Sequence, residues 1–269
     1  MTLCVRRPID ELVVEIGGTP RKADVRIVSK PGGLTPHRWV FLATKAQDTD
    51  AAAPWLARLA AAGSTVVVLQ NGVDQIERIA PLAPGAEIVP TVVHTSAEKV
   101  APGRIVLHTG QTLVLAAGRT HELIAELFAG TGVRIEANAE FTTEAWRKLM
   151  GNVSVNPITA LTQRRIGVMH EPDVRDLARG LLTEAVAVAR AEGAKLAPDE
   201  VEKTLAVYSA FNPNGGSSMY YDRLAGRPME HEYLTGVLVR RAERHGLPVP
   251  LNRAMLALLR AVANAPQAA

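Results

Sequence analysis

Cysteine is almost absent from this sequence of 269 residues. Its one cysteine, Cys4, cannot form a disulfide within the chain, so we expect a reducing, cytoplasmic compartment. No apolar run reaches the roughly 18 residues that span a bilayer. The N-terminus also lacks a signal-peptide pattern, because Arg6 and Arg7 follow its first apolar residues. We therefore expect no disulfide framework and no membrane partner.

The chain also has little excess of one charge over the other. The net charge is +3, and the arginines are scattered rather than clustered, so the sequence does not predict a nucleic-acid partner. A basic pI is compatible with an anionic small ligand. Aromatic residues make up only 4% of the chain, but 47% of it is hydrophobic, which predicts a globular protein long enough for two domains.

The first half of the chain alternates strand and helix patterns. Two continuous apolar runs, residues 39–43 and 65–69, are typical of strands buried on both faces of a parallel sheet, and a helical pattern follows each of them. Nearer the N-terminus, residues 12–16 and 24–28 are rich in β-branched side chains and predict a hairpin. The alternation predicts an open α/β sheet over residues 1–139.

From residue 140 onward the pattern is helical, and we place the domain boundary there. This predicts an α/β domain at 1–139 and an all-α domain at 140–269. The expected helices are 140–161, 171–194, 198–210, 217–224, 229–246 and 253–264.

Polar side chains follow three of the predicted strands. Lys45, Asn71 and Ser96 lie just beyond the carboxyl ends of these strands, where doubly wound sheets bind their ligands. Singly, a lysine after a strand or an Asn-Gly turn is a common surface feature. His94, close to Ser96, is by itself more typical of a structural histidine than of a base. Three such clusters together favour a ligand crevice.

The stretch 145–161, within the helix predicted over residues 140–161, carries an unusual polar stripe. Lys148, Asn152 and Asn156 recur every four residues and therefore share one face, between apolar flanks. Pro157 removes a backbone donor and predicts a kink just past Asn156. The alternative interpretation is a solvated helix face, because lysine and asparagine are common at surfaces.

A second polar segment lies at residues 217–236. Ser217 can cap a helix. Glu230 falls near the start of the helix predicted over 229–246, where the helix dipole favours a carboxylate. Taken alone, this position is explained by helix-start chemistry.

Several segments in this chain resemble the ketopantoate reductase (2-dehydropantoate 2-reductase) family, in the family's order and spacing over residues 40–252. The lysine–asparagine–asparagine–proline helix with a downstream Ser-Ser-Met and Gly-Arg-x-x-Glu is the most specific part. The matching segments are TKAQ at 44–47, QNGV at 70–73, WRKLMGNVSVNPITAL at 146–161, SSMYYD at 217–222, GRPMEHEYLTG at 226–236 and RHGLPVPLN at 244–252.

The resemblance implies an activity and an architecture. The family reduces 2-dehydropantoate to (R)-pantoate with NADPH, a step of pantothenate biosynthesis. Its fold is a Rossmann-like doubly wound sheet that binds the dinucleotide, followed by an all-α C-terminal domain for substrate binding and dimerisation. We therefore expect NADP(H), a small 2-oxo acid and a second copy of the chain as partners, and no metal.

The resemblance also implies a role for each site residue. Lys148 would donate a proton to the ketone oxygen, and Glu230 would orient Lys148 and the cofactor end of the site. Asn152 and Asn156 would hold the hydroxyl side of the substrate, and Ser218 its carboxylate. Lys45, Asn71 and Ser96 would line the cofactor crevice, and Arg6 matches the position that meets the NADP 2′-phosphate.

The chain departs from the family pattern at its start. The family opens with a strand, a G-x-G-x-x-G turn and a helix, a unit of about 30 residues for which this sequence has no counterpart before Met1. Either the start lies further upstream, or this is a truncated paralogue that binds NADPH weakly or not at all. Losing the central strand would leave edges at 2–5 and 39–43, which would pair with each other or with another molecule.

Smaller departures leave the substrate open. Tyr221 stands where the family often has glutamine, Glu232 where it often has aspartate, Thr235 where it often has asparagine, and Gly215 where an asparagine often helps to bind the carboxylate. Asn214 is adjacent to Gly215. Two alternatives follow: a reductase of another 2-oxo acid, and a non-catalytic, dimerising protein that kept the helical domain.

Overall fold

A computed structural model describes residues 1–264, which form two compact units. The N-terminal unit comprises residues 1–44, 49–70 and 76–139. The helical unit comprises residues from 140 onward together with two short segments, 45–48 and 71–75, which follow strands of the other unit in sequence. A single cut at residue 139 would separate these two segments from the helices to which they belong.

The N-terminal unit contains all the strands of the described residues, arranged in three sheets. The strands are β1 (Thr2–Cys4), β2 (Val13–Ile16), β3 (Thr19–Lys22), β4 (Arg26–Val28), β5 (Trp39–Leu42), β6 (Thr65–Val68), β7 (Glu87–Pro90), β8 (Val92–Ala101), β9 (Arg104–Ala116) and β10 (Arg134–Asn138). Its helices are α1 (Thr49–Leu59), α2 (Gln75–Ile79) and α3 (Arg119–Leu127).

Strands β5, β6 and β7 form a parallel sheet. Its central strand, β6, is buried on both faces, as the apolar run predicts. Successive side chains of a strand point to opposite faces. Val66 and Val68 accordingly join one core with Leu56 of α1, whereas Val67 joins a second core with Ile124 of α3. The β-branched sequence of β6 suits a strand covered on both sides.

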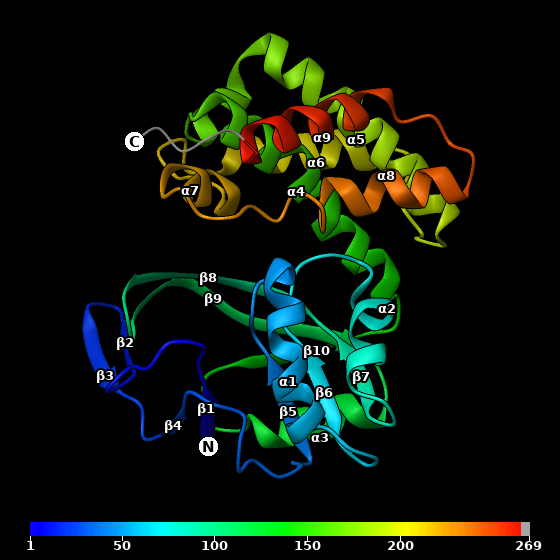
Figure 1. The fold of residues 1–269 in the computed structure, drawn as a ribbon. Helices are drawn as coiled ribbons and strands as arrows, with labels where there is room; N and C mark the ends of the chain where they lie inside the picture. The colour runs from blue at the N-terminus through cyan, green and yellow to red at the C-terminus, as the bar shows by residue number, and fades with distance from the viewer. Residues whose placement is uncertain (265–269) are drawn as a thin grey trace. The chain divides into compact units, whose positions relative to one another are not determined.

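A larger mixed sheet has the order β10–β9–β2–β3, with β8 paired to β9 as a long antiparallel ribbon (Figure 1). The predicted hairpin between 12–16 and 24–28 is wrong in its second strand. β2 pairs with β3 across Gly17 and Gly18, which both have positive φ (56° and 78°), as a two-residue hairpin turn requires. This tight turn places residues 19–22, rather than 24–28, next to β2.

The strands do not form the single doubly wound sheet that we expected. β4 pairs in parallel with β1, and β5 pairs with β6, so within residues 1–264 β1 and β5 are not paired with each other. Cys4 of β1 nevertheless packs against the core beneath β5 and β6. The expected closure of the sheet by pairing 2–5 with 39–43 is therefore not observed.

The helical unit surrounds one long helix, α4, on which α5, α7 and α9 pack (Figure 1). Its core includes large side chains that are almost fully buried, such as Trp146, Met150, Leu182 and Met219. The helices are α4 (Phe141–Thr162), α5 (Pro172–Ala191), α6 (Glu200–Ala210), α7 (Ser218–Leu224), α8 (Thr235–Arg244) and α9 (Pro250–Ala263), with 3-10 turns at Ala46–Asp48 and Ile166–His170.

The predicted helices agree with this arrangement, with one clear exception. Helix 229–246 begins only at Thr235, because the carbonyl of Glu230 accepts the N–H groups of Tyr233 (3.0 Å) and Leu234 (3.1 Å) in a turn that precedes it. Helix α4 continues through Pro157 to Thr162, so the proline does not end it. Within residues 1–264, no helix has the length and apolar character needed to cross a membrane.

Candidate active site

The site is built on one face of α4. Lys148, Asn152 and Asn156 follow one another at intervals of four residues, so they lie one above the other along the helix. The neighbouring residues Trp146 and Leu149 are buried in the helical core and fix how the helix is rotated. The polar stripe is not a solvated face, because Lys148 is only partly exposed and Asn156 is 4% exposed.

Burial changes the acidity of Lys148. Loss of solvent lowers the pKa of its ammonium to about 8, and the nearby negative charge of Glu230 opposes this shift by raising it. The group is therefore still mostly protonated at neutral pH, but it releases its proton more readily than a surface lysine does. A proton donor that works near neutral pH requires this combination.

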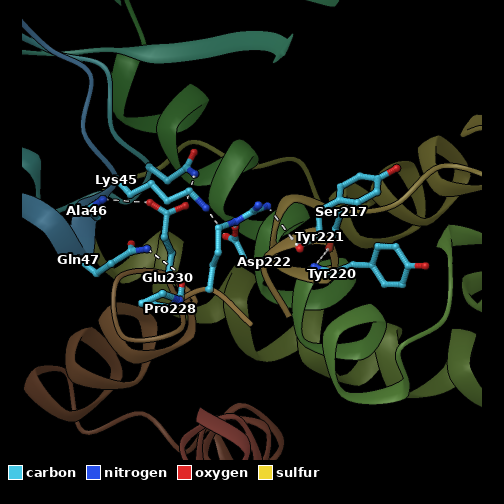
Figure 2. Close-up of polar contacts among 11 residues, drawn as sticks. Lys45, Ala46, Gln47, Ser217, Tyr220, Tyr221, Asp222, Pro228 and Glu230 are labelled. Carbon is cyan, nitrogen blue, oxygen red and sulfur yellow. Dashed lines mark hydrogen bonds and ion pairs between the residues drawn. The ribbon is translucent and has the colours of Figure 1, made fainter. Parts of the chain in front are cut away.

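Glu230 is buried and holds two segments that are distant in sequence. Its Oε1 accepts the backbone N–H of Ala46 at 3.1 Å (Figure 2). Its Oε2 accepts a hydrogen bond from Nδ2 of Asn71 at 3.0 Å. The prediction that Glu230 lies near a helix start is wrong, since α8 begins five residues later. The carboxylate is stabilised by these two donors and by Lys148 rather than by a helix dipole.

Lys45 reaches a partner that the sequence analysis did not assign. Its Nζ forms an ion pair with Oδ2 of Asp222, the buried fifth residue of α7, and Nε of Arg227 lies 3.0 Å from the other carboxylate oxygen (Figure 2). A signal was present in SSMYYD, because an aspartate four residues after Ser218 shares its helix face. Nothing local in the sequence indicated that Lys45, 177 residues away, is its partner.

Asn156 presents a buried donor. Among the described residues, its Nδ2 has no hydrogen-bond partner. An amide N–H that is buried without an acceptor costs free energy, so an oxygen of a bound molecule would find a favourable place there. Asn152, one turn earlier, is partly exposed on the same face.

The start of α7 is fixed to α4. Ser217 caps α7, as predicted: its Oγ accepts the N–H of Tyr220 at 3.1 Å and lies 2.7 Å from Oγ1 of Thr159 on α4. Ser218, the first residue of α7, is exposed next to this cap. The predicted carboxylate-binding side chain is therefore close to the helix that carries Asn156.

Arg6 and Ser96 belong to the N-terminal unit. Arg6 is exposed and follows β1, whereas Ser96 is exposed in β8 at a shift of the β8–β9 register. Their roles toward a cofactor remain predictions. By contrast, Lys45, Asn71, Lys148, Asn152, Asn156, Ser218 and Glu230 all belong to the helical unit.

The residues fit a nicotinamide nucleotide in part. Lys45 and Asn71 offer a cation and an amide beside Glu230, which suits the polar end of such a cofactor. For the pyrophosphate, only single glycines, Gly72 and Gly118, stand between a strand and a helix in residues 1–264, and neither belongs to a G-x-G-x-x-G sequence.

Comparison with protein families gives a match along almost the whole chain. The profile of ketopantoate reductase PanE/ApbA matches residues 1–119, and that of the ketopantoate reductase PanE/ApbA C-terminal region matches residues 140–263. These matches cover both units.

Individual relatives agree with the profiles. A 2-dehydropantoate 2-reductase from Caulobacter vibrioides is 37% identical over 263 residues, which cover 98% of this chain and 90% of that protein. A 2-dehydropantoate 2-reductase from Mycobacterium tuberculosis is 39% identical over 264 residues, covering 93% and 89%.

Solved structures show the same fold. A dimeric ketopantoate reductase from Staphylococcus aureus superposes with a TM-score of 0.88 at 26% identity, covering 97% of this chain and 90% of that one. A PanE/ApbA family ketopantoate reductase from Ralstonia eutropha gives 0.86 at 30% identity, covering 94% and 85%. The resemblance seen in the sequence motifs is thus confirmed, and the chain belongs to the ketopantoate reductase family.

Proposed function

We propose that this protein reduces 2-dehydropantoate to (R)-pantoate with NADPH. The names of its relatives support the reaction, and the site on α4 supports the chemistry. In this proposal the Rossmann-like N-terminal unit binds the nucleotide, with Arg6 toward the 2′-phosphate and Ser96 near the crevice, and the helical unit binds the substrate.

The partly buried ammonium of Lys148, on the same face of α4 as Asn152 and Asn156, is the observation that carries the proposal. Bound NADPH would supply a hydride to the ketone carbon. Lys148 gives its proton to the ketone oxygen, so that the carbonyl becomes a hydroxyl. Its positive charge also stabilises the negative charge that develops on that oxygen.

The other residues orient the reactants. Glu230 holds Lys148 through its charge and fixes Asn71 through a hydrogen bond. Asn152 and the unpaired Nδ2 of Asn156 would bind the hydroxyl side of the substrate, and Ser218 its carboxylate. A ketone held at fixed distance from Lys148 reacts faster because its orientation is already set.

Steady-state turnover is the direct test. We expect NADPH oxidation with 2-dehydropantoate, measured by the absorbance of NADPH over a wide range of cofactor concentrations, and (R)-pantoate as the product. A chain that binds NADPH but turns over no 2-oxo acid would contradict the proposal and favour a non-catalytic family member.

A second candidate substrate is another 2-oxo acid. Its support lies around Ser218, where Gly215 in the loop before α7 and Tyr221 on α7 replace the residues most common in the family. The hydroxyl of Tyr221 accepts the N–H of Gly216 at 3.2 Å, so the tyrosine contacts this loop from α7. A panel of 2-oxo acids separates the two candidates: a competitor that exceeds 2-dehydropantoate in kcat/KM would replace it.

We also propose that the protein is a homodimer. The related reductase from S. aureus is dimeric, and α9 exposes Leu251 and Leu258 seven residues apart on one face. Light scattering after size exclusion, over a range of concentrations, tests this. A monomer at every concentration would overturn it.

A further inference from the structure

Asp222 is a buried carboxylate whose two cationic partners, Lys45 and Arg227, are much more exposed than it is. Only 3% of the Asp222 side chain is exposed, whereas 39% of Lys45 and 55% of Arg227 are exposed. The carboxylate is therefore the fixed, internal member of the cluster, and the two cations extend from it toward solvent. A buried carboxylate without cations would be costly, so it constrains both partners.

Each oxygen of Asp222 serves a different cation. Oδ2 faces Nζ of Lys45, and Oδ1 faces Nε of Arg227 at 3.0 Å (Figure 2). The backbone carbonyl of Asp222 also accepts the N–H of Arg227 at 2.8 Å, which closes the turn after α7. The two functions of the residue can therefore be separated by mutating one cation at a time.

The segment that carries Lys45 is held at three successive residues. Ala46 donates its N–H to Glu230, and Nε2 of Gln47 donates to the carbonyl of Pro228 at 3.0 Å, while Lys45 is held through its side chain by Asp222 (Figure 2). Removing the charge of Asp222 would release the Lys45 side chain and leave the backbone of the segment in place.

Asp222 also shares a helix face with Ser218, four residues earlier on α7. We propose that Asp222 is a positioning residue that holds the Lys45 ammonium at the cofactor side of the site. Because Asp222 and Ser218 lie on the same face of α7, the position of Lys45 is tied to that of Ser218 at the substrate side. The inference rests on the proposed function, in which Lys45 faces NADPH and Ser218 the 2-oxo acid. According to this inference, α7 couples the binding of NADPH to the binding of the 2-oxo acid.

The first test needs no cofactor. Acetylation of Lys45 in the folded protein, followed by mass spectrometry, is expected to be about fivefold faster in Asp222→Asn than in the wild type. Arg227→Gln should leave the rate unchanged, since it removes only the contact at Oδ1. Lys195, which is exposed and pairs with Glu140, is the internal control. Asp222→Glu keeps the charge and should stay within about twofold of the wild type.

The second test is kinetic. Asp222→Asn should raise the KM for NADPH about fivefold with a smaller change in kcat, and Lys45→Gln should do the same. The double variant should be no worse than Lys45→Gln, because both changes remove one interaction. The factor by which a saturating 2-oxo acid tightens NADPH binding should also fall in Asp222→Asn.

Three results would overturn the inference. They are equal labelling of Lys45 in the wild type and Asp222→Asn, the same defects in Arg227→Gln, and additive effects with Lys45→Gln. If Asp222→Asn does not fold, equal labelling of Lys45 in the wild type and Asp222→Ala would count against it in the same way. A wild type without turnover would overturn the proposed function alone, because the labelling still decides whether Asp222 holds Lys45.

Discussion

The two units of this protein stabilise themselves in different ways. The helical unit buries one continuous apolar core around α4, whereas the N-terminal unit divides its apolar residues between two smaller cores on either side of β6. The site residues that contact one another lie in the helical unit, including the segments that follow β5 and β6. Lys148, the predicted proton donor, and the residues that contact Glu230 therefore belong to the unit with the single continuous core.

The first prediction tests whether the two units are energetically separate. Leu182 in the helical core and Leu115 in the strand unit are both almost fully buried. Each change to alanine should cost about 3 kcal/mol, since it removes buried methyl groups and leaves a cavity. Hydrogen exchange with mass spectrometry should show the loss of protection mainly in the unit that carries the mutation.

Leu127→Ala is the matched control, because this leucine is 47% exposed at the end of α3. It should change stability by less than about 0.5 kcal/mol. Equal loss of protection in both units after Leu182→Ala would show that they unfold together.

The second prediction concerns the chemistry assigned to the helical unit. Lys148→Ala removes the proton donor and the cation near the developing alkoxide, so kcat should fall roughly 100-fold or more. The affinity for NADPH should change little. Lys195→Ala, which removes an exposed lysine, should keep the wild-type kcat. A Lys148→Ala enzyme with most of its kcat would contradict the role of Lys148 as the proton donor.

The third prediction concerns the strand unit. The 269-residue chain should bind NADPH weakly, because its described residues offer no glycine-rich turn for the pyrophosphate. Fusing a strand–G-x-G-x-x-G–helix segment ahead of Met1 should tighten binding at least about tenfold, toward the micromolar range. Calorimetry measures both, and the same segment with its glycines replaced by valine is the control. Micromolar binding by the unmodified chain would contradict this account.

The smallest expected effect is a shift in pH dependence. The ammonium of Lys148 must be protonated to act, so kcat should be level below the pKa of about 8 and fall above it. Glu230 raises that pKa, so in Glu230→Gln the fall should begin at lower pH. An unchanged pH profile in Glu230→Gln would show that another group controls the rate. The melting temperature must be compared as well, because Glu230 also holds Ala46 and Asn71.

The lowered pKa of Lys148 also predicts how the free energy of unfolding depends on pH. The pKa of Lys148 is lowered on folding, so between about 8 and its ordinary value the unfolded chain binds more protons. The cost of burying the charged lysine is fully present below pH 8 and is relieved as the pH rises through that window. Urea titrations of the wild type and Lys148→Met should therefore converge as the pH is raised from 8 to 10.

The sequence by itself determined the elements that depend on local periodicity. The burial of β6 on both faces, the face of α4 with Lys148, Asn152 and Asn156, and the cap at Ser217 follow from side-chain pattern and spacing. The family followed from the order of short motifs.

Only the tertiary structure decided which distant groups meet. The pairing of Lys45 with Asp222, the binding of Ala46 by Glu230 across 184 residues, and the pairing of β2 with β9 and of β4 with β1 are absent from any local pattern. The lowered pKa of Lys148 is of the same kind, because it arises from solvent removed by the packed helices and from a charge on a distant loop. Periodicity specifies a face, but burial and charge at that face depend on what the rest of the chain places against it.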